Sequence, residues 1–456
     1  MRSHRRSTTI FQVGAAAVAV LLLAGACSSS KGKKSAVSSK STGTTAASPA
    51  TAAANVKDVH AQALPLALND GVPSGTKIGL LVSGSGPGND IFGPATGAYI
   101  AAYRLNGASG SQTGTVQLIV KDDSADPTAA VAAMQDFAKQ GVAGVVYASS
   151  GDQMVPAVQA AAQAGLPVLV PYSGDTRLTQ QGATTFLTGP SDDQVAAKLV
   201  KQAASRNLQK VAVLHEAGSY GDAGLAALQK AGLVPIKEAA FQPTEADLNA
   251  EVKQFTDAGA DGLIVWADAT EAVKATTSAS TAATPLTLLF GSRAATPAFG
   301  RLETTLLAPT AQDGLLSAGT WAGPWTPTNT IDAFYEAKAK SVSDGGVIAD
   351  LTNADVRSHD AVVALAFAAK AAKSNKASDV LNALKTLKPA VAGTPLDFSQ
   401  QSAVTDGNVA MVTYSTVDDG SGRYPDVTTA GGHWVAVDGS YTLPDSLKGL
   451  DNAYGG

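Results

Sequence analysis

The chain has 456 residues, a formal net charge of −5 and a single cysteine, and hydrophobic residues make up 45% of it. Its 33 basic and 38 acidic residues are interspersed without a basic stripe, which argues against nucleic-acid binding. The five histidines are scattered without metal-ligand spacing, so we expect neither a metal nor another cofactor.

The N-terminus has the pattern of an export signal. Three arginines among the first six residues precede an apolar run over 13–24, which is short for a membrane span. The run ends in Leu-Ala-Gly-Ala before Cys27, and this resembles a bacterial lipobox, in which the cysteine thiol carries a lipid. One departure is Ala24, which stands where a large aliphatic residue is usual, and a plain secretory signal is the alternative. We predict a signal peptide over 1–26, lipidation of Cys27, and a location on the outer face of the cytoplasmic membrane.

Residues 27–75 consist mainly of Ser, Thr, Ala and Lys without apolar periodicity. Such a segment cannot bury enough surface to offset the entropy of ordering it, so we predict a flexible tether. The roughly 380 residues that follow exceed what one hydrophobic core usually serves, and we expect two lobes.

After the tether, short apolar strands alternate with helices. Asp126 and Pro127 begin a helix well, because Asp caps the first turn and Pro lacks an N–H that would have no partner there; Gly141 then ends it. The predicted strands are 77–83, 115–121, 144–148, 168–170, 211–215, 263–266, 286–290, 409–416 and 433–437. The predicted helices are 93–106, 127–140, 153–164, 192–206, 223–231 and 245–258. This alternation predicts an α/β fold of doubly wound parallel sheets, with ligand sites at the carboxyl ends of the strands.

The loops that follow these strands resemble those of the type I periplasmic binding proteins, the branched-chain amino-acid binder family. The resemblance rests on the order of Ser-Gly-Ser-Gly-Pro (83–87), Lys-Asp-Asp-Ser-Ala-Asp-Pro (121–127), Tyr-Ala-Ser-Ser-Gly (147–151), Pro-Tyr-Ser-Gly-Asp-Thr (171–176) and the Tyr-Gly pair at 220–221. It implies two Rossmann-like lobes joined by a three-crossover hinge. Lobe one is expected at 76–189 plus 322–388, and lobe two at 190–321 plus 389–446. It also implies that a ligand is held between the lobes, which close around it.

The same resemblance implies a set of binding residues. Hydroxyls and amides at the strand ends of lobe one would bind the ligand's carboxylate: Ser149, Ser150, Gly151, Tyr172, Ser173 and Thr176. In lobe two Tyr220 would cover the ligand, and Phe92 would line the cleft.

One position departs from the family pattern. Amino-acid binders carry an acidic residue after the strand at 286–290, where it pairs with the ligand's ammonium, but this chain has Gly-Ser-Arg at 291–293. Arg293 would repel an ammonium and could hold a carboxylate, phosphate or carbonyl in a two-pronged contact. Asp268 and Asp175 remain candidates for an ammonium.

Signatures of catalysis are weak. The glycines at 84–88 have G-x-G-x-G spacing instead of the dinucleotide-binding spacing, and neither a phosphate loop nor a nucleophile elbow occurs. Asp122 and Asp123 are neighbours at a strand end and point to opposite faces, so we interpret them as a solvated turn and not an acid–base pair. We therefore expect a monomeric solute-binding lipoprotein, without enzymatic activity, that delivers a small polar molecule to the membrane subunits of an ABC permease. The alternative is a sensor that signals by lobe closure.

Overall fold

The structure is a computed structural model that describes residues 71–83, 97–98, 101–102, 105–106, 115–295, 299, 316–320, 353–387, 396–404, 406, 409–415 and 433–436. All of them belong to one compact unit, Ser48–Gly456. The predicted signal peptide, Cys27, the tether up to residue 70 and Phe92 lie outside the described residues.

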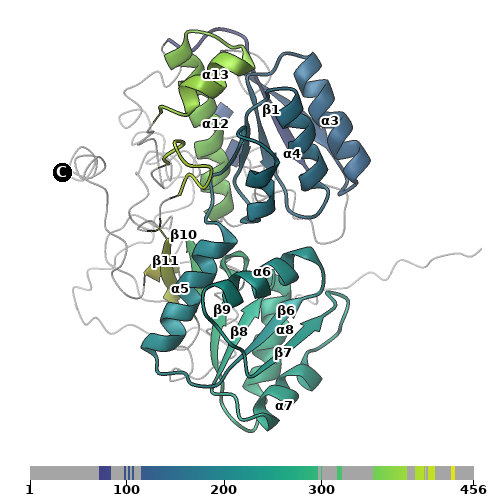
Figure 1. Cartoon of the computed structure of the whole chain (residues 1–456), viewed down its shortest axis with the longest axis vertical. Helices are drawn as coiled ribbons and strands as arrows, with labels where there is room; N and C mark the ends of the chain where they lie inside the picture. Colours follow the sequence, from purple (N-terminus) through teal and green to yellow (C-terminus); the bar gives the residue numbers. More distant parts are fainter. Residues whose placement is uncertain are drawn as a thin grey trace, which may run out of the picture. The chain divides into compact units, whose positions relative to one another are not determined.

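A five-stranded sheet with the order β2-β1-β3-β4-β5 forms from the first part of the described chain. Figure 1 labels its strand β1. Its strands are β1 (Thr76–Val82), β2 (Val116–Asp122), β3 (Gly144–Ala148), β4 (Val168–Val170) and β5 (Thr185–Leu187). Neighbouring strands pair in parallel throughout this order. The short, almost wholly apolar strands fit a parallel sheet that is covered on both faces.

Helices cover both faces of this first sheet. In β1, Ile78 and Leu80 belong to one hydrophobic core with α12 (Asn353–Ala372) and α13 (Ala377–Leu384). The intervening Leu81 packs instead in a second core with α3 (Pro127–Lys139) and α4 (Met154–Gln163). Successive residues of a strand point to opposite faces, so this division identifies a doubly wound sheet, as predicted.

The predicted capping of α3 is confirmed. The Asp126 side chain accepts a hydrogen bond from the Ala129 amide at 2.7 Å, and Pro127 stands at the first helical position. Gly141, just beyond the helix, has a φ of +65°, which glycine adopts without the steric penalty of a side chain.

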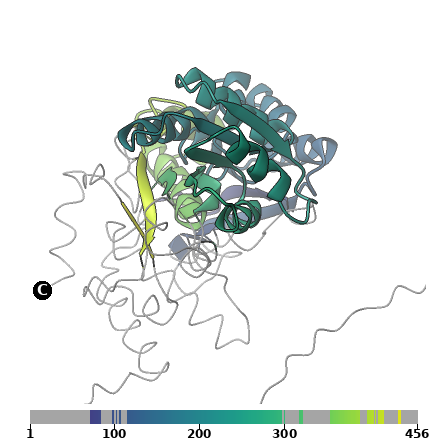
Figure 2. The ribbon, with the colours of Figure 1, turned by 90° about the horizontal axis from the view of Figure 1, so that it is seen from below.

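The second sheet has seven strands in the order β12-β11-β10-β9-β8-β6-β7. They are β6 (Val211–Glu216), β7 (Lys237–Phe241), β8 (Gly262–Trp266), β9 (Thr287–Phe290), β10 (Leu316–Thr320), β11 (Val409–Ser415) and β12 (His433–Ala436). Within this sheet β10, β9, β8, β6 and β7 run parallel to one another, whereas β11 pairs antiparallel with both β10 and β12. Figure 2 shows β11 and β12, in yellow, beside each other.

Two helix pairs cover the second sheet. Val213 in β6 packs in a core with α5 (Asp192–Ser205) and α6 (Ser219–Lys230). Leu214 packs in the opposite core with α7 (Asn249–Asp257) and α8 (Ala269–Ser280). The doubly wound plan is thus used twice.

Several elements differ from the prediction: β5, β10 and α13 fall outside the predicted ranges, α7 begins at Asn249 and not at 245, and three further cases have a clear cause. Strand β7, with the sequence Lys-Glu-Ala-Ala-Phe, and helix α8 were not predicted, because β7 is a largely exposed strand without an apolar run and α8 is rich in Thr and Ser. Helix α6 begins at Ser219, ahead of the predicted 223, so Tyr220 lies in a helical turn and not in a loop. The first turns of α6 were not predicted because glycine is unfavourable inside a helix. A Cβ on Gly224 would lie 2.3 Å from the buried indole of Trp266, so packing requires glycine there.

A late segment of the chain completes the edge of the first sheet at β5. The Leu187 amide donates to the carbonyl of Gln401 at 2.7 Å, and the Ala403 amide donates to the carbonyl of Leu187 at 2.9 Å. The Gln401 side-chain amide donates to the carbonyls of Thr179, Gly182 and Thr185 at 3.0, 2.7 and 3.1 Å. Residues separated by more than two hundred positions thus hold this edge together.

Candidate functional site

Buried hydroxyl groups form a network at the carboxyl ends of β1, β2 and β3. Asp123, wholly buried, accepts from the hydroxyls of Ser83 and Tyr147, and its Oδ1 also accepts from the Ala125 amide at 2.9 Å. Burial, reinforced by the Asp123 carboxyl group, raises the pKa of Tyr147 and keeps its phenol protonated. The prediction of a solvated turn is therefore wrong for Asp123. Asp122 alone is exposed, because the two side chains point to opposite faces.

The predicted residues Ser149 and Ser150 join this network. The Ser149 and Ser83 hydroxyl oxygens are 2.5 Å apart. The side-chain amide of Gln153 donates to the Ser150 carbonyl at 2.9 Å and lies 3.2 Å from both hydroxyl oxygens. The predicted Gly151 connects these residues with a φ of +120°, which favours glycine. Sequence reading missed Ser83, Asp123 and Gln153 as members of the group; their only signal was their position at strand ends.

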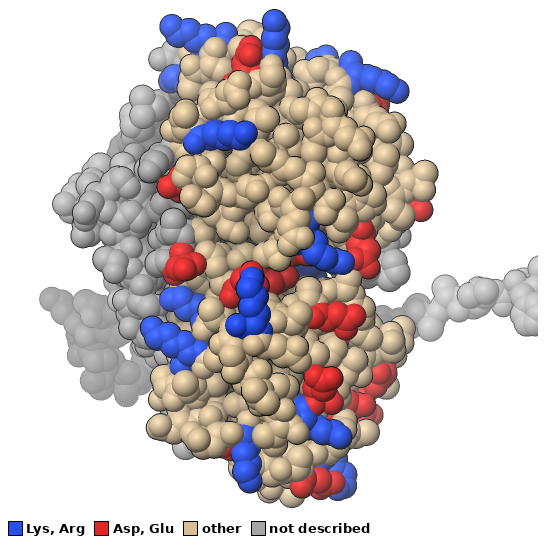
Figure 3. Space-filling view, viewed as in Figure 1, with Lys and Arg blue, Asp and Glu red and all other residues tan. Residues whose placement is uncertain are grey.

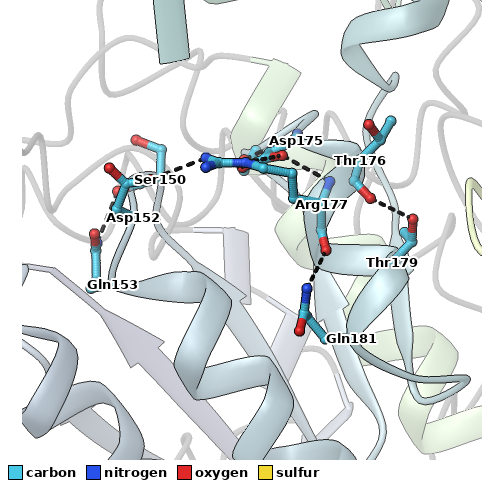
Figure 4. Close-up of polar contacts among 9 residues, drawn as sticks. Ser150, Asp152, Gln153, Asp175, Thr176, Arg177, Thr179 and Gln181 are labelled. Atoms are coloured by element: carbon cyan, nitrogen blue, oxygen red, sulfur yellow. Dashed lines mark hydrogen bonds and ion pairs between the residues drawn. The ribbon is translucent and has the colours of Figure 1, made fainter. Parts of the chain in front are cut away.

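Arg177 joins two loops of the first sheet (Figure 4). Its guanidinium donates to Asp175 from Nε at 3.0 and 3.1 Å and from a terminal nitrogen at 2.7 Å, and it reaches Asp152 at 3.1 Å. Asp175 also caps the short helix η2 (Thr176–Gln181) through the Arg177 amide at 2.9 Å. The Asp175 carboxylate, one of the two candidates for a ligand ammonium, thus already has a cation as its partner.

The predicted residues Ser173 and Thr176 lie in the second of these loops. Ser173 is buried and its hydroxyl oxygen accepts from the Asp175 amide at 3.3 Å, while the Thr176 carbonyl accepts from the Thr179 hydroxyl at 2.8 Å. Both therefore support the shape of the loop in this structure.

The second group forms around Arg293, which follows β9 in the single turn η3 (Ser292–Ala294). Its guanidinium carbon lies 3.6 Å from the centroid of the Tyr220 ring and 5.1 Å from that of Tyr172. One terminal nitrogen is 3.4 Å from Asp268, and only 7% of the arginine side chain is exposed. Four predicted residues, which are far apart in the sequence, thus come together.

The electrostatics keep Arg293 charged despite its burial. Burial lowers its pKa, but Asp268, the two tyrosines and Asp192 outweigh that effect, and the pKa is raised overall. An arginine that is buried between aromatic rings is well suited to receive a planar anion.

This group has unused capacity to donate hydrogen bonds. A guanidinium has five N–H donors, and among the described residues the long contact with Asp268 is the one hydrogen bond of Arg293. The Tyr220 hydroxyl is buried and, within the described part of the chain, has no hydrogen-bond partner. Buried donors without acceptors are costly, so the arrangement favours a ligand that supplies acceptor oxygens, such as a carboxylate.

Two acids beside this group were missed by sequence reading. Burial raises the pKa of Asp192 to about 7, with Arg293 opposing and Asp175 reinforcing the shift. Burial and then Asp268 raise the pKa of Glu216 to about 7. From the sequence, Asp192 has the position of an ordinary first residue of a helix, after the capping residue Ser191. In the structure its amide also donates to the Gly174 carbonyl at 2.8 Å. The start of α5 is thus fastened to the loop that carries Tyr172 and Ser173.

The charged surface residues that the structure describes do not indicate a further binding site. On the face drawn in Figure 3, acidic and basic side chains are interspersed. Among the described residues, no helix combines the length and the apolar character needed to cross a bilayer.

Comparison with known proteins gives concordant results. The family model described as "Periplasmic binding protein" matches residues 75–421. The Leu/Ile/Val-binding protein homolog 3 of Brucella melitensis is 28% identical over 171 residues, which are 36% of this chain and 46% of that relative. The chain thus matches about half the length of such curated relatives.

Solved structures extend the likeness over most of the chain. The periplasmic binding protein type 1 of Bordetella pertussis aligns with a TM-score of 0.60 and 16% identity, covering 79% of this chain and 100% of that one. A branched-chain amino acid transporter substrate-binding protein of Streptococcus pneumoniae, in complex with isoleucine, aligns with a TM-score of 0.58 and 18% identity, covering 79% and 99%. The fold expected from the sequence, that of the type I periplasmic binding proteins, is confirmed.

Proposed function

The chain belongs to the periplasmic binding protein family, and from that premise we propose that it captures a small carboxylate-bearing molecule outside the cytoplasm for an ABC importer. The family consists of exported, extracytoplasmic solute-binding proteins and is not a family of enzymes. Its relatives include proteins named for binding Leu, Ile and Val, so an amino-acid-like ligand is our first candidate.

The observation that carries the proposal is Arg293 between Tyr172 and Tyr220. Its side chain is 7% exposed, yet most of its N–H donors have no acceptor among the described residues. Keeping a buried guanidinium in this state costs free energy, and a ligand carboxylate would offset that cost with two parallel hydrogen bonds. Asp268 lies beside the guanidinium at 3.4 Å and would orient it.

The remaining parts of the proposal concern the organisation of the chain. We propose lobes at 76–189 plus 322–388 and at 190–321 plus 389–446, which close on the ligand, with residues 396–404 reassigned to the first lobe because they pair with β5 and pack in its core. We also propose that the signal peptide 1–26 is removed, that Cys27 carries the lipid anchor and that 27–75 is the tether of a monomeric protein. The resemblance of the Cys27 segment to a lipobox supports the anchor.

A ligand screen tests the proposal. Full-length mature protein is titrated calorimetrically and by thermal shift with amino acids, hydroxy acids, dicarboxylates, their uncharged amides, and sugars. We expect carboxylates to raise the melting temperature by several degrees at about one hundred times their Kd, because they bind the folded state alone. Amides or sugars that bind as well as the matched carboxylates would contradict the role given to Arg293.

The lipid anchor needs a separate test. Expression of the whole chain and of the Cys27→Ser variant in a bacterial host, followed by detergent phase partitioning, should place the wild type in the membrane fraction and the variant in the medium. Equal partitioning of the two, once the signal peptide has been removed from both, would exclude lipidation of Cys27.

A further inference from the structure

We propose that Ser149 presents a hydrogen-bond acceptor to the ligand, so that the ligand group received there is a donor such as an ammonium, an amide N–H or a hydroxyl, and not the carboxylate. This inference rests on the proposed function, since it assigns the polarity of one part of the same site. It follows from counting the hydrogens in the buried network at the ends of β1, β2 and β3.

The first step fixes the hydrogen of Ser83. The Ser83 hydroxyl donates to Oδ1 of Asp123, and the Ala125 amide donates to the same oxygen at 2.9 Å. The Tyr147 hydroxyl donates to the other oxygen, so three donors converge on Asp123, which acts as a carboxylate and has no hydrogen to give. The single hydrogen of Ser83 is therefore committed to Asp123.

The second step fixes the hydrogen of Ser149. The two serine oxygens are 2.5 Å apart, a separation that requires a hydrogen between them. Ser83 has none left, so Ser149 donates. The alternative acceptor for Ser149, the carbonyl of Ser150, is 3.4 Å away and would leave two oxygens in repulsive contact.

The third step counts what Ser149 has left. Gln153 turns its nitrogen toward the network, because that nitrogen also meets the Ser150 carbonyl at 2.9 Å, and a carbonyl can only accept. The same nitrogen lies 3.2 Å from the Ser149 oxygen. A hydroxyl has one hydrogen and two lone pairs, so one lone pair of Ser149 remains for a ligand.

The consequence is that the two groups have opposite polarity toward a ligand. Arg293 and the Tyr220 hydroxyl offer donors and call for acceptor oxygens, whereas the side chain of Ser149 offers an acceptor. The resemblance to amino-acid binders implied a carboxylate at the Ser149 hydroxyl. In this chain that hydroxyl has no hydrogen to give, and the arginine takes the carboxylate.

The test uses three sets of matched acids: alanine, lactate and pyruvate; leucine, 2-hydroxy-4-methylpentanoate and 4-methyl-2-oxopentanoate; and glutamate, 2-hydroxyglutarate and 2-oxoglutarate. Within each set the group beside the carboxylate is an ammonium, a hydroxyl or a ketone, and the ketone alone cannot donate. For the set that binds, calorimetry on the mature wild-type chain should give a Kd roughly ten- to hundredfold weaker for the keto acid.

Ser83→Ala supplies the internal control. It removes the acceptor that holds the hydrogen of Ser149, so that the hydroxyl can turn and donate to a ketone, and the difference within the set should fall to about threefold or less. Ser205→Ala, at an exposed serine whose hydroxyl donates to the Gln202 carbonyl, should leave the ratio unchanged. A wild-type protein that binds the keto acid as tightly as the amino acid, or a ratio that Ser83→Ala does not alter, would overturn the assignment.

A neutron crystal structure of the mature chain decides the polarity without any ligand. A deuteron bonded to the Ser149 oxygen and directed at Ser83 supports the inference, and a deuteron bonded to Ser83 in that position refutes it. Failure of every acid to bind would count against the proposed function alone, because the neutron result stands independently of it.

Discussion

Replacing Arg293 by methionine should weaken ligand binding strongly while changing the stability of the fold only a little. The substitution removes a cation–π contact at 3.6 Å, worth about 2 kcal/mol when desolvated, and a weaker contact at 5.1 Å. It also removes an ion pair with Asp268, which is 31% exposed, worth about 0–1 kcal/mol. Against this loss stands the desolvation of a guanidinium whose side chain is 7% exposed, which costs several kcal/mol. The terms nearly cancel, so we expect the free energy of unfolding to change by less than about 2 kcal/mol, or a few degrees in Tm.

Binding should respond much more strongly. Loss of one partner of a buried charge pair costs about 2–5 kcal/mol, so Arg293→Met should weaken a carboxylate ligand by at least about thirtyfold. Calorimetric titration gives the Kd and thermal denaturation gives the Tm of the same preparation. Arg206→Met, at the opposite end of α5 from Asp192, serves as the matched control and should change neither quantity appreciably. An unchanged Kd in Arg293→Met, or a Tm lower by more than about ten degrees, would show that the arginine is structural.

Three further substitutions probe packing, titration and loop position. Gly224→Ala places a Cβ 2.3 Å from the Trp266 ring and should destabilise the protein by about 1–3 kcal/mol in denaturant unfolding, with partial rescue by Trp266→Phe; a neutral result would contradict the close packing. Burial raises the pKa of Asp192 from 3.8 to about 7, so its contribution to stability is complete below about pH 4 and is lost as the pH rises through 7. Asp192→Asn should therefore gain Tm relative to wild type more at pH 8 than at pH 4, and a pH-independent difference would refute this assignment. Arg177→Ala unties Asp152 from Asp175 and should speed amide hydrogen exchange in both loops, whereas unchanged exchange would show that the ion pairs do not hold them.

Most of the fold could be predicted from the sequence because short stretches of residues indicate their own secondary structure. Apolar runs such as 144–148 and the Asp-Pro start of α3 predict their own structure, and the bounds predicted for these two elements agree with the observed ones to within a residue or two. The exceptions are instructive. Helix α6 carries glycines that only the Trp266 ring and a neighbouring carbonyl explain, and β7 is an edge strand without an apolar run.

The site was accessible only in part, because it depends on contacts between distant residues. The resemblance to a family placed Tyr172, Tyr220 and Arg293 in the segments that follow strands, and the structure stacks the arginine on both rings. No local pattern could show that Asp123 is buried, since its burial depends on Ser83, just after β1, and on Tyr147 in β3. The direction of a hydrogen bond between two hydroxyls is even harder to predict from the sequence, because it depends on which hydroxyl already donates its hydrogen to another group.

The hydrogen bonds that Gln401 and Ala403 make at the edge of β5 bear on the order in which the molecule can be completed. The first sheet receives its last partner, and the α12 and α13 cover of one face, from segments that are synthesised after the whole of β6 to β9. Contacts of such long sequence separation form slowly, because a large loop must close before they contribute. The first sheet therefore stays open on one face until the residues up to 403 are available to pack against it. The first sheet is thus the part most exposed to aggregation or proteolysis if synthesis stops early.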